Sequence, residues 1–472
     1  MAEIESVRKI DLEFDVPREE CGVFGVYGES DDFDAASITL NALFGLQHRG
    51  QESAGIAVSD TRKISVHKGM GLVKEVFTDD DMDRLKGPLA IGHVRYSTAG
   101  GSLLVNAQPM VVNTSLGTIA VAHNGNLANA TALRSELTSS GAMFQSTSDT
   151  EIILNLIARS RKTDLPEALK EACAKMSGSY ALVFLTPRSI AALRDPMGNR
   201  PLCLGRLGHA YLVASESCAL ATIGAKLIRD IEPGELVVVD SNGLHSVQLL
   251  RSQRRAVCAM EYIYFARPDS EIDGKVIHLV RKAMGRQLAR ESKIEADIVI
   301  PVPDSGWSTA LGFSEESSIP IDIGLNVNRY VGRTFIQPKQ ELRNRGVTLK
   351  LTPIDAVIRG KRVAIIDDSI VRGTTSGVLV NLLREAGAAQ VHMLISSPPW
   401  RFPCLYGIDV SGTRELIASS HTVEEIRRFI NADTLYYLSL EGLYAAIGRP
   451  ADELCVACFT GDYPTETPQL CK

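Results

Sequence analysis

Little in this sequence would place the protein in a membrane, outside the cell or on nucleic acid. No apolar run reaches the length of about 20 residues that a membrane-spanning helix needs. The first twenty residues hold seven acidic and three basic residues without an apolar segment, which excludes a secretory signal and fits a transit peptide poorly. The net charge of −6 argues against nucleic acid as a main partner. We therefore expect a cytoplasmic protein without a membrane or nucleic-acid partner.

Two other common signatures are missing. The sequence lacks the lysine pattern of Walker P-loops. Its nine cysteines are an odd number in a large chain without secretory features, so catalysis or metal binding is favoured over a disulfide framework. The composition, 45% hydrophobic and 22% charged, is that of a folded globular protein. A chain of 472 residues is too long for one ordinary core, which predicts two or three domains.

The stretch that organises the chain is residues 362–376, which read RVAIIDDSIVRGTTS. A short β-branched run predicts a buried parallel strand that ends at the adjacent carboxylates Asp367 and Asp368. Backbone N–H groups at the start of the following helix can hold a phosphate, and the carboxylates can bind sugar hydroxyls or a divalent cation. The loop and helix start supply Arg372, Gly373, Thr374, Thr375 and Ser376.

Each piece of this stretch also has a plain explanation. An acidic pair at a strand end is often a solvated turn, and a Thr-Thr-Ser run is often a helix cap. The combined order is more specific, and it resembles the 5-phosphoribosyl 1-diphosphate (PRPP) motif of the type I phosphoribosyltransferases.

A second strand, turn and helix precede this motif. Residues 297–300 read as a buried strand, and Asp304 and Ser305 follow it before a helix from Trp307. Alternating strands and helices predict a mainly parallel sheet whose carboxyl edge carries both turns. Between them, Asn328 to Leu351 is long, basic and irregular. It is either a lid that shields PRPP from water or a solvated loop.

The N-terminal half carries a different set of motifs. CGVFGV begins at Cys21 and is followed in order by LQHRGQESAG, GHVRYSTAG, AHNGNLAN and STSDTE. These stretches resemble the glutaminase domain of the class II glutamine amidotransferases, the N-terminal-nucleophile family, over roughly residues 21–240. Polar residues 241–255 are the best candidate for a domain boundary.

A glutaminase needs the side chains that these motifs offer. Cys21 would be the nucleophile, and its α-amine would be the general base once cleavage after Glu20 removes residues 1–20 as a propeptide. Asn124 and the Gly125 N–H would stabilise the oxyanion. The glutamine-binding residues would be Arg95, for the substrate carboxylate, Asp149, for its α-amine, and Thr98. Plain readings remain for two of them, because Asn-Gly is a common turn and Asp149 a plausible helix cap.

A CxxC pair, Cys455 and Cys458, lies near the C-terminus. This spacing suits zinc, an iron–sulfur cluster or a redox dithiol, and spacing alone favours zinc. The further ligands come from resemblance: Cys258 in CAMEYIYFARPDS and Cys404 in PPWRFPCLYGID match the cluster-bearing branch of the amidophosphoribosyltransferases. That branch carries a [4Fe–4S] cluster on four cysteines and a propeptide before the nucleophile. The cluster would be a structural staple.

Taken whole, the chain after residue 20 resembles the amidophosphoribosyltransferases. The resemblance implies an α/β and α+β architecture: an N-terminal-nucleophile αββα sandwich at 21–250 and a type I phosphoribosyltransferase domain at 251–472. It implies that glutamine, water and PRPP give 5-phosphoribosylamine, glutamate and pyrophosphate, with ammonia passed internally. It also implies Mg²⁺ near Ser305, Asp367 and Asp368, feedback inhibition by purine nucleotides, and a homotetramer.

Two other functions fit parts of the pattern. One is a glutaminase fused to a PRPP-sensing regulatory module, which pyrophosphate release would distinguish. The other is an amidotransferase with a sugar-phosphate isomerase domain, against which the PRPP motif argues.

Overall fold

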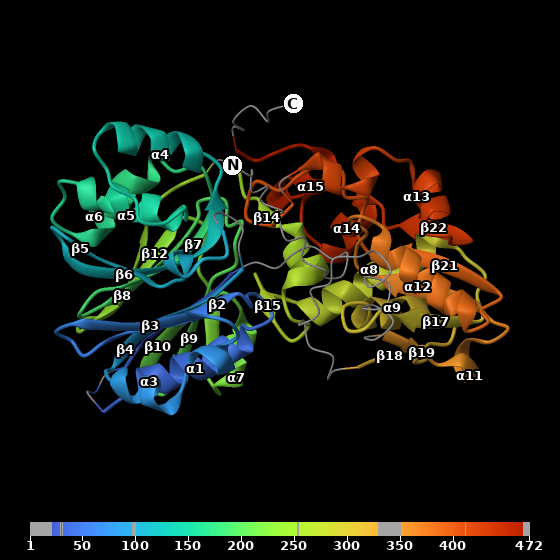
Figure 1. The fold of residues 1–472 in the computed structure, drawn as a ribbon, viewed down its shortest axis with the longest axis horizontal. Coiled ribbons are helices and arrows are strands. Elements are labelled where there is room, and N and C mark those ends of the chain that lie inside the picture. The colour runs from blue at the N-terminus through green and yellow to red at the C-terminus, as the bar shows by residue number, and fades with distance from the viewer. Residues whose placement is uncertain are drawn as a thin grey trace, which may run out of the picture. The chain divides into compact units, whose positions relative to one another are not determined.

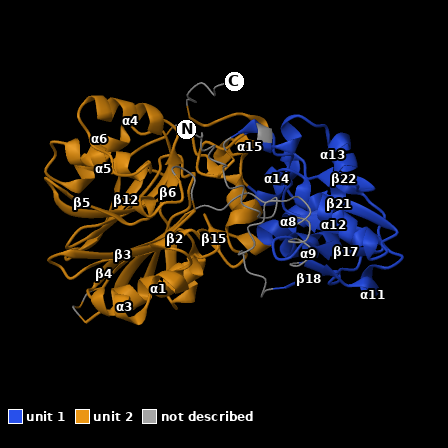
Figure 2. Cartoon of the chain, in the orientation of Figure 1, with its two compact units in different colours: residues 1–17, 279–402, 412–448 blue, residues 18–278, 403–411, 449–472 orange. Residues whose placement is uncertain are grey.

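The computed structural model describes residues 21–28, 30, 32–96, 101–252, 254–328, 351–410 and 412–465. The predicted propeptide, Thr98 and nearly all of the predicted lid lie outside these ranges. The chain forms two compact units (Figure 2). The sandwich unit contains the described residues of 18–278, 403–411 and 449–472, and the parallel-sheet unit those of 279–402 and 412–448. Within the described residues, no helix is long and apolar enough to span a membrane.

Two antiparallel sheets form the centre of the sandwich unit (Figure 1). The first has the strand order β11-β9-β10-β1-β4-β2-β3. Its strands are β1 (Gly22–Tyr27), β2 (Ser53–Ser59), β3 (Ile64–Met70), β4 (Leu89–Arg95), β9 (Cys203–Leu207), β10 (Ala210–Ala214) and β11 (Lys226–Asp230). The second has the order β13-β12-β8-β7-β6-β5. Its strands are β5 (Met110–Thr114), β6 (Gly117–Leu127), β7 (Gly178–Leu185), β8 (Ile190–Arg194), β12 (Glu235–Asp240) and β13 (Gly243–Gln248).

Three apolar layers hold this sandwich together. Val23, Ile91 and Val183 belong to the layer between the two sheets. Helices α1 (Ala35–Gly45), α2 (Val73–Val76), α3 (Asp79–Arg84) and α7 (Ser217–Thr222) cover the outer face of the first sheet. Helices α4 (Ala130–Ser139), α5 (Thr150–Arg159) and α6 (Leu165–Cys173) cover the second. The predicted αββα glutaminase fold is therefore confirmed.

The segment that follows the sandwich strands folds back onto them. β14 (Val257–Cys258) pairs in parallel with β23 (Leu454–Cys455), although almost 200 residues separate them. A π-helical turn, η2 (Glu261–Phe265), and the strands β15 (Glu271–Ile272) and β16 (Lys275–Val276) belong to the same unit. The compact units therefore divide the chain near residue 278, whereas the sequence predicted a boundary at 250. The reason is that buried ion pairs and the β14–β23 pair tie residues 257–278 to the sandwich unit.

The parallel-sheet unit is built on four strands in the order β17-β20-β21-β22, all parallel. They are β17 (Ile298–Pro301), β20 (Arg362–Asp367), β21 (Gln390–Ile395) and β22 (Thr434–Tyr437). The principal helices are α8 (Ile277–Ser292), α9 (Trp307–Ser317), α12 (Thr374–Glu385), α13 (Val423–Phe429) and α14 (Leu440–Ile447). A short antiparallel pair, β18 (Leu325–Val327) and β19 (Leu351–Pro353), precedes α11 (Asp355–Ile358). The predicted parallel sheet is confirmed.

Candidate functional site

Cys21 lies immediately before β1, in the middle of the first sheet. Its side chain is buried, and its Sγ donates to the carbonyl oxygen of Tyr96 at 3.5 Å. Burial raises the pKa of the Cys21 thiol to about 11, against the opposing effect of the Arg95 guanidinium. Asp149 and Glu52 raise this pKa further. The predicted nucleophile is therefore protonated at neutral pH and needs a base.

The two charged residues predicted to bind the substrate, Arg95 and Asp149, lie beside the thiol. Arg95 is the last residue of β4, is almost fully buried, and has Glu52 at 3.7 Å from its Nη1. Asp149 is the N-cap residue of α5, but its side chain makes no capping hydrogen bond; its carboxylate accepts from the backbone N–H of Leu127 at 2.9 Å. Burial opposes ionisation of Asp149, yet His123 and backbone N–H groups lower its pKa overall. An ionised Asp149 suits a bound ammonium group.

The predicted oxyanion residues are positioned by strand β6. This strand continues through Asn124 and Gly125, which pair with Ala181 and Tyr180 of β7. The strand runs through the Asn-Gly pair, so the turn reading of this pair is wrong. Asn124 Nδ2 is buried and has no hydrogen-bond partner among the described residues. Such a donor is available to a ligand oxygen.

Gly125 has no room for a side chain. Its φ is +147°, and a Cβ would lie 2.2 Å from the carbonyl oxygen of Ser179. Two buried histidines support this part of the strand: His93 Nε2 lies 3.0 Å from the His123 carbonyl oxygen, which joins β4 to β6. Burial lowers the pKa of His93 to about 3, so its ring is neutral. The sequence reading missed both histidines, although GHVRY and AHNGN contain them.

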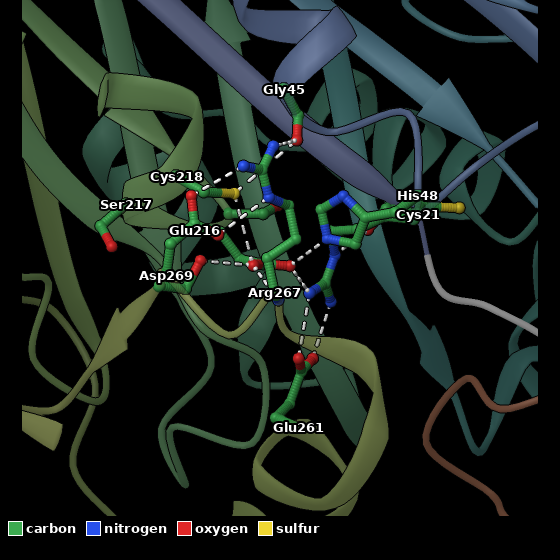
Figure 3. A network of polar contacts seen from close by, with 12 residues as sticks. Cys21, Gly45, His48, Glu216, Ser217, Cys218, Glu261, Arg267 and Asp269 are labelled. Carbon is green, nitrogen blue, oxygen red and sulfur yellow. Dashed lines mark hydrogen bonds and ion pairs between the residues drawn. The ribbon is translucent and has the colours of Figure 1, made fainter. Parts of the chain in front are cut away.

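A buried charge network lies behind Cys21 (Figure 3). Arg49 forms a bidentate ion pair with Glu261: its Nη1 donates to Oε2 at 2.9 Å and its Nη2 to Oε1 at 2.7 Å. Its Nη1 also lies 2.5 Å from Glu216, and its Nε donates to the Cys21 carbonyl oxygen at 3.1 Å. This network was not predicted, because Glu216 and Glu261 lie more than 160 residues from Arg49.

One corner of this network has the composition of a metal site. His48, Glu216 and Cys218 offer ligand atoms within 4.8 Å of one another. Both oxygens of Glu216 are already engaged, however, by His48 Nε2 at 2.8 Å on one side and the Ser270 hydroxyl at 2.6 Å on the other. The Arg49 guanidinium contacts the same carboxylate and would repel a cation. We therefore interpret this corner as part of an ion-pair network.

The predicted PRPP residues come together at the carboxyl edge of the parallel sheet. Strands β17 and β20 are neighbours, with Pro301 opposite Ile366. The turn after β17 lies on the end of β20: Val302 N–H donates to the Ile366 carbonyl oxygen at 2.8 Å. A Cβ on Gly306 would lie 2.4 Å from that same oxygen. This close approach brings the turn that holds Asp304 and Ser305 to the acidic pair.

The two carboxylates sit where the strand ends. Asp367 is the last residue of β20, and its Oδ1 accepts from the Asp368 N–H at 2.9 Å. Asp368 Oδ1 accepts from the Ser369 hydroxyl at 2.6 Å, whereas its Oδ2 is buried without a partner in the described part of the chain. Burial raises the pKa of Asp368, against hydrogen bonds from Ser369 and Ser305. The pair is thus not a solvated turn.

The loop after the acidic pair leads into a helix without a side-chain cap. Gly373, with φ +77°, is the N-cap of α12, so neither Thr374 nor Thr375 nor Ser376 serves as the cap. Thr374 is exposed, whereas Thr375 and Ser376 are buried. Arg372 forms an ion pair with Glu415. Backbone N–H groups and hydroxyls at a helix start form an anion site.

The four predicted cluster cysteines lie in one unit. Cys258 and Cys455 are paired residues of β14 and β23. Cys404 packs against Cys455 in one apolar cluster. Burial raises the pKa of Cys455 to about 11, and the Cys404 thiol raises it further. Burial also raises the pKa of Cys458, with added effects of Cys455 and Cys404. Thiols whose ionised forms repel one another lie near one another, and such a group of thiols fits a shared metal group.

Comparison with known proteins agrees with both halves of the fold. A glutamine amidotransferase domain model matches residues 93–222. Amidophosphoribosyltransferase of Bacillus subtilis (strain 168) is 51% identical over 456 residues, 96% of this chain and 95% of that protein. The enzyme of the same name from Archaeoglobus fulgidus is 49% identical, over 95% of this chain and 98% of its own. The chain belongs to the amidophosphoribosyltransferase family.

A solved member of the family has the same fold. The glutamine PRPP amidotransferase of B. subtilis complexed with ADP and GMP matches with a TM-score of 0.90 and 50% identity, over 95% of this chain and 98% of that one. Amidophosphoribosyltransferases catalyse the glutamine-dependent amination of PRPP in purine biosynthesis. Family membership confirms the predicted resemblance and the predicted type of enzyme, a pentosyl-transferring glutamine amidotransferase.

Proposed function

We propose that this chain transfers the amide nitrogen of glutamine to C1 of PRPP, giving 5-phosphoribosylamine, glutamate and pyrophosphate. The observation that carries the proposal is that one chain holds both a buried cysteine among an arginine, an aspartate and an unpartnered amide, and a parallel-sheet edge with an acidic pair and an open helix N-terminus. Family membership over nearly the whole chain supports combining the two activities.

The glutaminase half-reaction begins at Cys21. Cleavage of the Glu20–Cys21 peptide bond would free the α-amine, whose ordinary pKa is about 7.7–8.0. The amine takes the thiol proton, the sulfur attacks the amide carbon, and the oxyanion accepts from Asn124 and the Gly125 N–H. The C–N bond then breaks, and the proton leaves with ammonia. Water hydrolyses the thioester to glutamate and restores the thiol.

Recognition of glutamine follows from the charges around the thiol. Arg95 would bind the α-carboxylate, and Asp149 the α-ammonium group. Thr98 belongs to the same proposal, on the basis of the GHVRYSTAG motif. These contacts fix the side-chain amide within reach of the sulfur.

The second half-reaction takes place at the sheet edge. Asp367 and Asp368 would accept hydrogen bonds from the ribose hydroxyls. The 5′-phosphate would bind at residues 372–376, and the turn with Asp304 and Ser305 would face the pyrophosphate. Ammonia attacks C1 of the ribose while the bond from C1 to the pyrophosphate oxygen breaks, and water takes the surplus proton.

Two cofactors belong to the proposal. Mg²⁺ would bind near Ser305, Asp367 and Asp368, where the unpartnered Asp368 Oδ2 offers the hard oxygen ligand that this ion prefers. When bound, it supplies charge neutralisation for the pyrophosphate. A [4Fe–4S] cluster on Cys258, Cys404, Cys455 and Cys458 would supply a structural link within the sandwich unit. Thiol ligands and a thiol nucleophile accord with a reducing compartment such as the cytoplasm.

Regulation and assembly complete the proposal. The related B. subtilis structure is described as complexed with ADP and GMP. We therefore propose purine nucleotides as feedback inhibitors, and a homotetramer as the assembly, which native mass measurement would test.

Cys21→Ser tests the function directly. The variant should lose glutamine-dependent formation of phosphoribosylamine and keep synthesis from free ammonia, because only the first half-reaction uses the thiol. Pyrophosphate release with wild-type protein, glutamine and PRPP separates the enzyme from a glutaminase that only senses PRPP. Equal loss of both activities, or no pyrophosphate from the wild type, would contradict the proposal.

A further inference from the structure

Cys21 depends on a side chain for the position of its backbone. The ladder between β1 and β4 begins at Gly22, opposite Val94, so Cys21 lies just outside it. The Cα of Cys21 carries both the thiol and the α-amine, so the Cys21–Gly22 peptide plane, which positions this Cα, positions both groups. The carbonyl oxygen of that plane accepts from the Nε of Arg49 at 3.1 Å. The placement of the proposed nucleophile and base therefore depends on one guanidinium.

That guanidinium is fixed by two carboxylates from distant parts of the chain (Figure 3). Glu261 engages both terminal nitrogens, at 2.9 and 2.7 Å, which fixes the plane of the group as well as its position. Glu216 accepts from Nη1 at 2.5 Å and is itself held by His48 and Ser270. All three charged side chains are at most 1% exposed.

We propose that Glu261 is a positioning residue for glutamine cleavage: through the Arg49 guanidinium it sets the orientation of Cys21 without contacting the substrate. This inference rests on the proposed function, since it takes Cys21 as the nucleophile. Glu261 lies in η2, outside all the glutaminase motifs. It contacts Arg49 only because the chain folds back onto the sandwich after its last strand. A glutaminase truncated after its last sandwich strand would lack it.

The test compares Glu261→Gln with wild type in two assays. Glutamine-dependent activity should fall by about 10–100-fold in kcat, with KM for glutamine changed far less, because the substrate contacts remain while the reacting groups are misaligned. Activity with ammonia should stay within about two-fold, since it does not use Cys21. A merely structural role would lower both activities together.

Asp273→Asn is the matched control. Asp273 follows Glu261 in the same segment, is largely buried, and accepts from two arginines, Arg194 at 3.0 Å and Arg449 at 3.1 Å. Among the interactions of the described residues, it is Arg49 that holds the Cys21 carbonyl oxygen, not either of those arginines. This variant should lose thermal stability to a similar degree while keeping kcat with glutamine within about two-fold. Parallel loss of kcat in both variants would show a general effect of buried charge and would overturn the proposal.

The remaining outcomes are also decisive. Unchanged kcat with glutamine in Glu261→Gln, or loss of both activities in it, would overturn the positioning role. Retention of glutamine use by Cys21→Ser would instead overturn the proposed function. If Cys21→Ser loses glutamine use while Glu261→Gln keeps the wild-type kcat with glutamine, the proposed function stands and only this inference is overturned.

Discussion

At the scale of single residues, the state of the Cys21 proton decides the chemistry. In the chain with residues 1–20 attached, the Cys21 nitrogen is part of a peptide bond, and burial holds the pKa of the thiol at about 11. His93 offers no substitute base, because its Nε2 donates to the His123 carbonyl oxygen and burial lowers the pKa of its ring to about 3. Release of the α-amine would thus convert an inert thiol into a nucleophile.

We therefore expect the alkylation of Cys21 to depend on cleavage. With the leader attached, the rate with iodoacetamide should rise about tenfold per pH unit from pH 8 toward pH 11, because only the thiolate reacts. After cleavage, the rise should begin near neutral pH, where the free amine can accept the proton. Mass spectrometry of the Cys21 peptide measures both rates.

Cys173 provides the internal control for this measurement. Burial raises the pKa of its thiol to about 12, and it lies on α6, away from the cleavage point. Its alkylation should be slow in both forms. Rapid alkylation of Cys21 at pH 7 with the leader attached would contradict the prediction.

At the scale of elements, glycines at close backbone contacts hold the sheet edge together. Gly306 allows the turn after β17 to lie on the end of β20, where a Cβ would be 2.4 Å from the Ile366 carbonyl oxygen. Because that atom is backbone in a central strand, it cannot move aside as a flexible side chain would. The turn must then move instead, and Ser305 with it.

Gly306→Ala should accordingly damage PRPP use. We expect KM for PRPP to rise at least tenfold with either nitrogen donor, while glutamine hydrolysis is retained. Gly377→Ala in α12 is the control, because its Cβ would meet only a backbone atom at 3.7 Å. That variant should be as stable as wild type or more so, by up to about 1 kcal/mol. Steady-state kinetics and thermal unfolding check both variants; normal PRPP saturation in Gly306→Ala would count against the sheet-edge site.

The elements differ in how far they could be predicted. β20 and α12 carry local signals, a β-branched run and a helix start, and in the structure the strand ends at Asp367 and the helix begins at Thr374, as predicted. The Asn-Gly pair of β6 allowed a turn reading, because Asn124 and Gly125 have strong turn propensity that pairing with β7 overrides. Arg49, Glu216 and Glu261 form one network only through tertiary contacts, which no local pattern encodes.

At the scale of the whole molecule, the cysteines join residues that are far apart in the chain. Within the sandwich unit, the segment after Cys404 contacts β6 and its neighbour β7: the Leu405 carbonyl accepts from Asn126 of β6 at 2.8 Å, and the Tyr406 carbonyl from Ser179 of β7 at 2.7 Å. A metal group on Cys404 would thus stabilise the strand that carries Asn124 and Gly125.

Protein purified without oxygen should then contain close to four iron and four acid-labile sulfide per chain. On exposure to air, activity with glutamine should decay faster than activity with ammonia, because the bonds to β6 lie in the sandwich unit. Metal analysis and paired assays during the exposure measure this. Stoichiometric zinc in active protein, or equal decay of both activities, would contradict the prediction.

The pairing of β14 with β23 also has a consequence for synthesis on the ribosome. Residue 454 emerges 176 residues after residue 278, and at about 5–20 residues per second this delay lasts roughly 9 to 35 s. Throughout that interval the nascent sandwich lacks its last strand pair, while the parallel-sheet unit is being completed. The sandwich unit, although it begins at the N-terminal end of the chain, is thus completed only after the whole of the parallel-sheet unit has been synthesised.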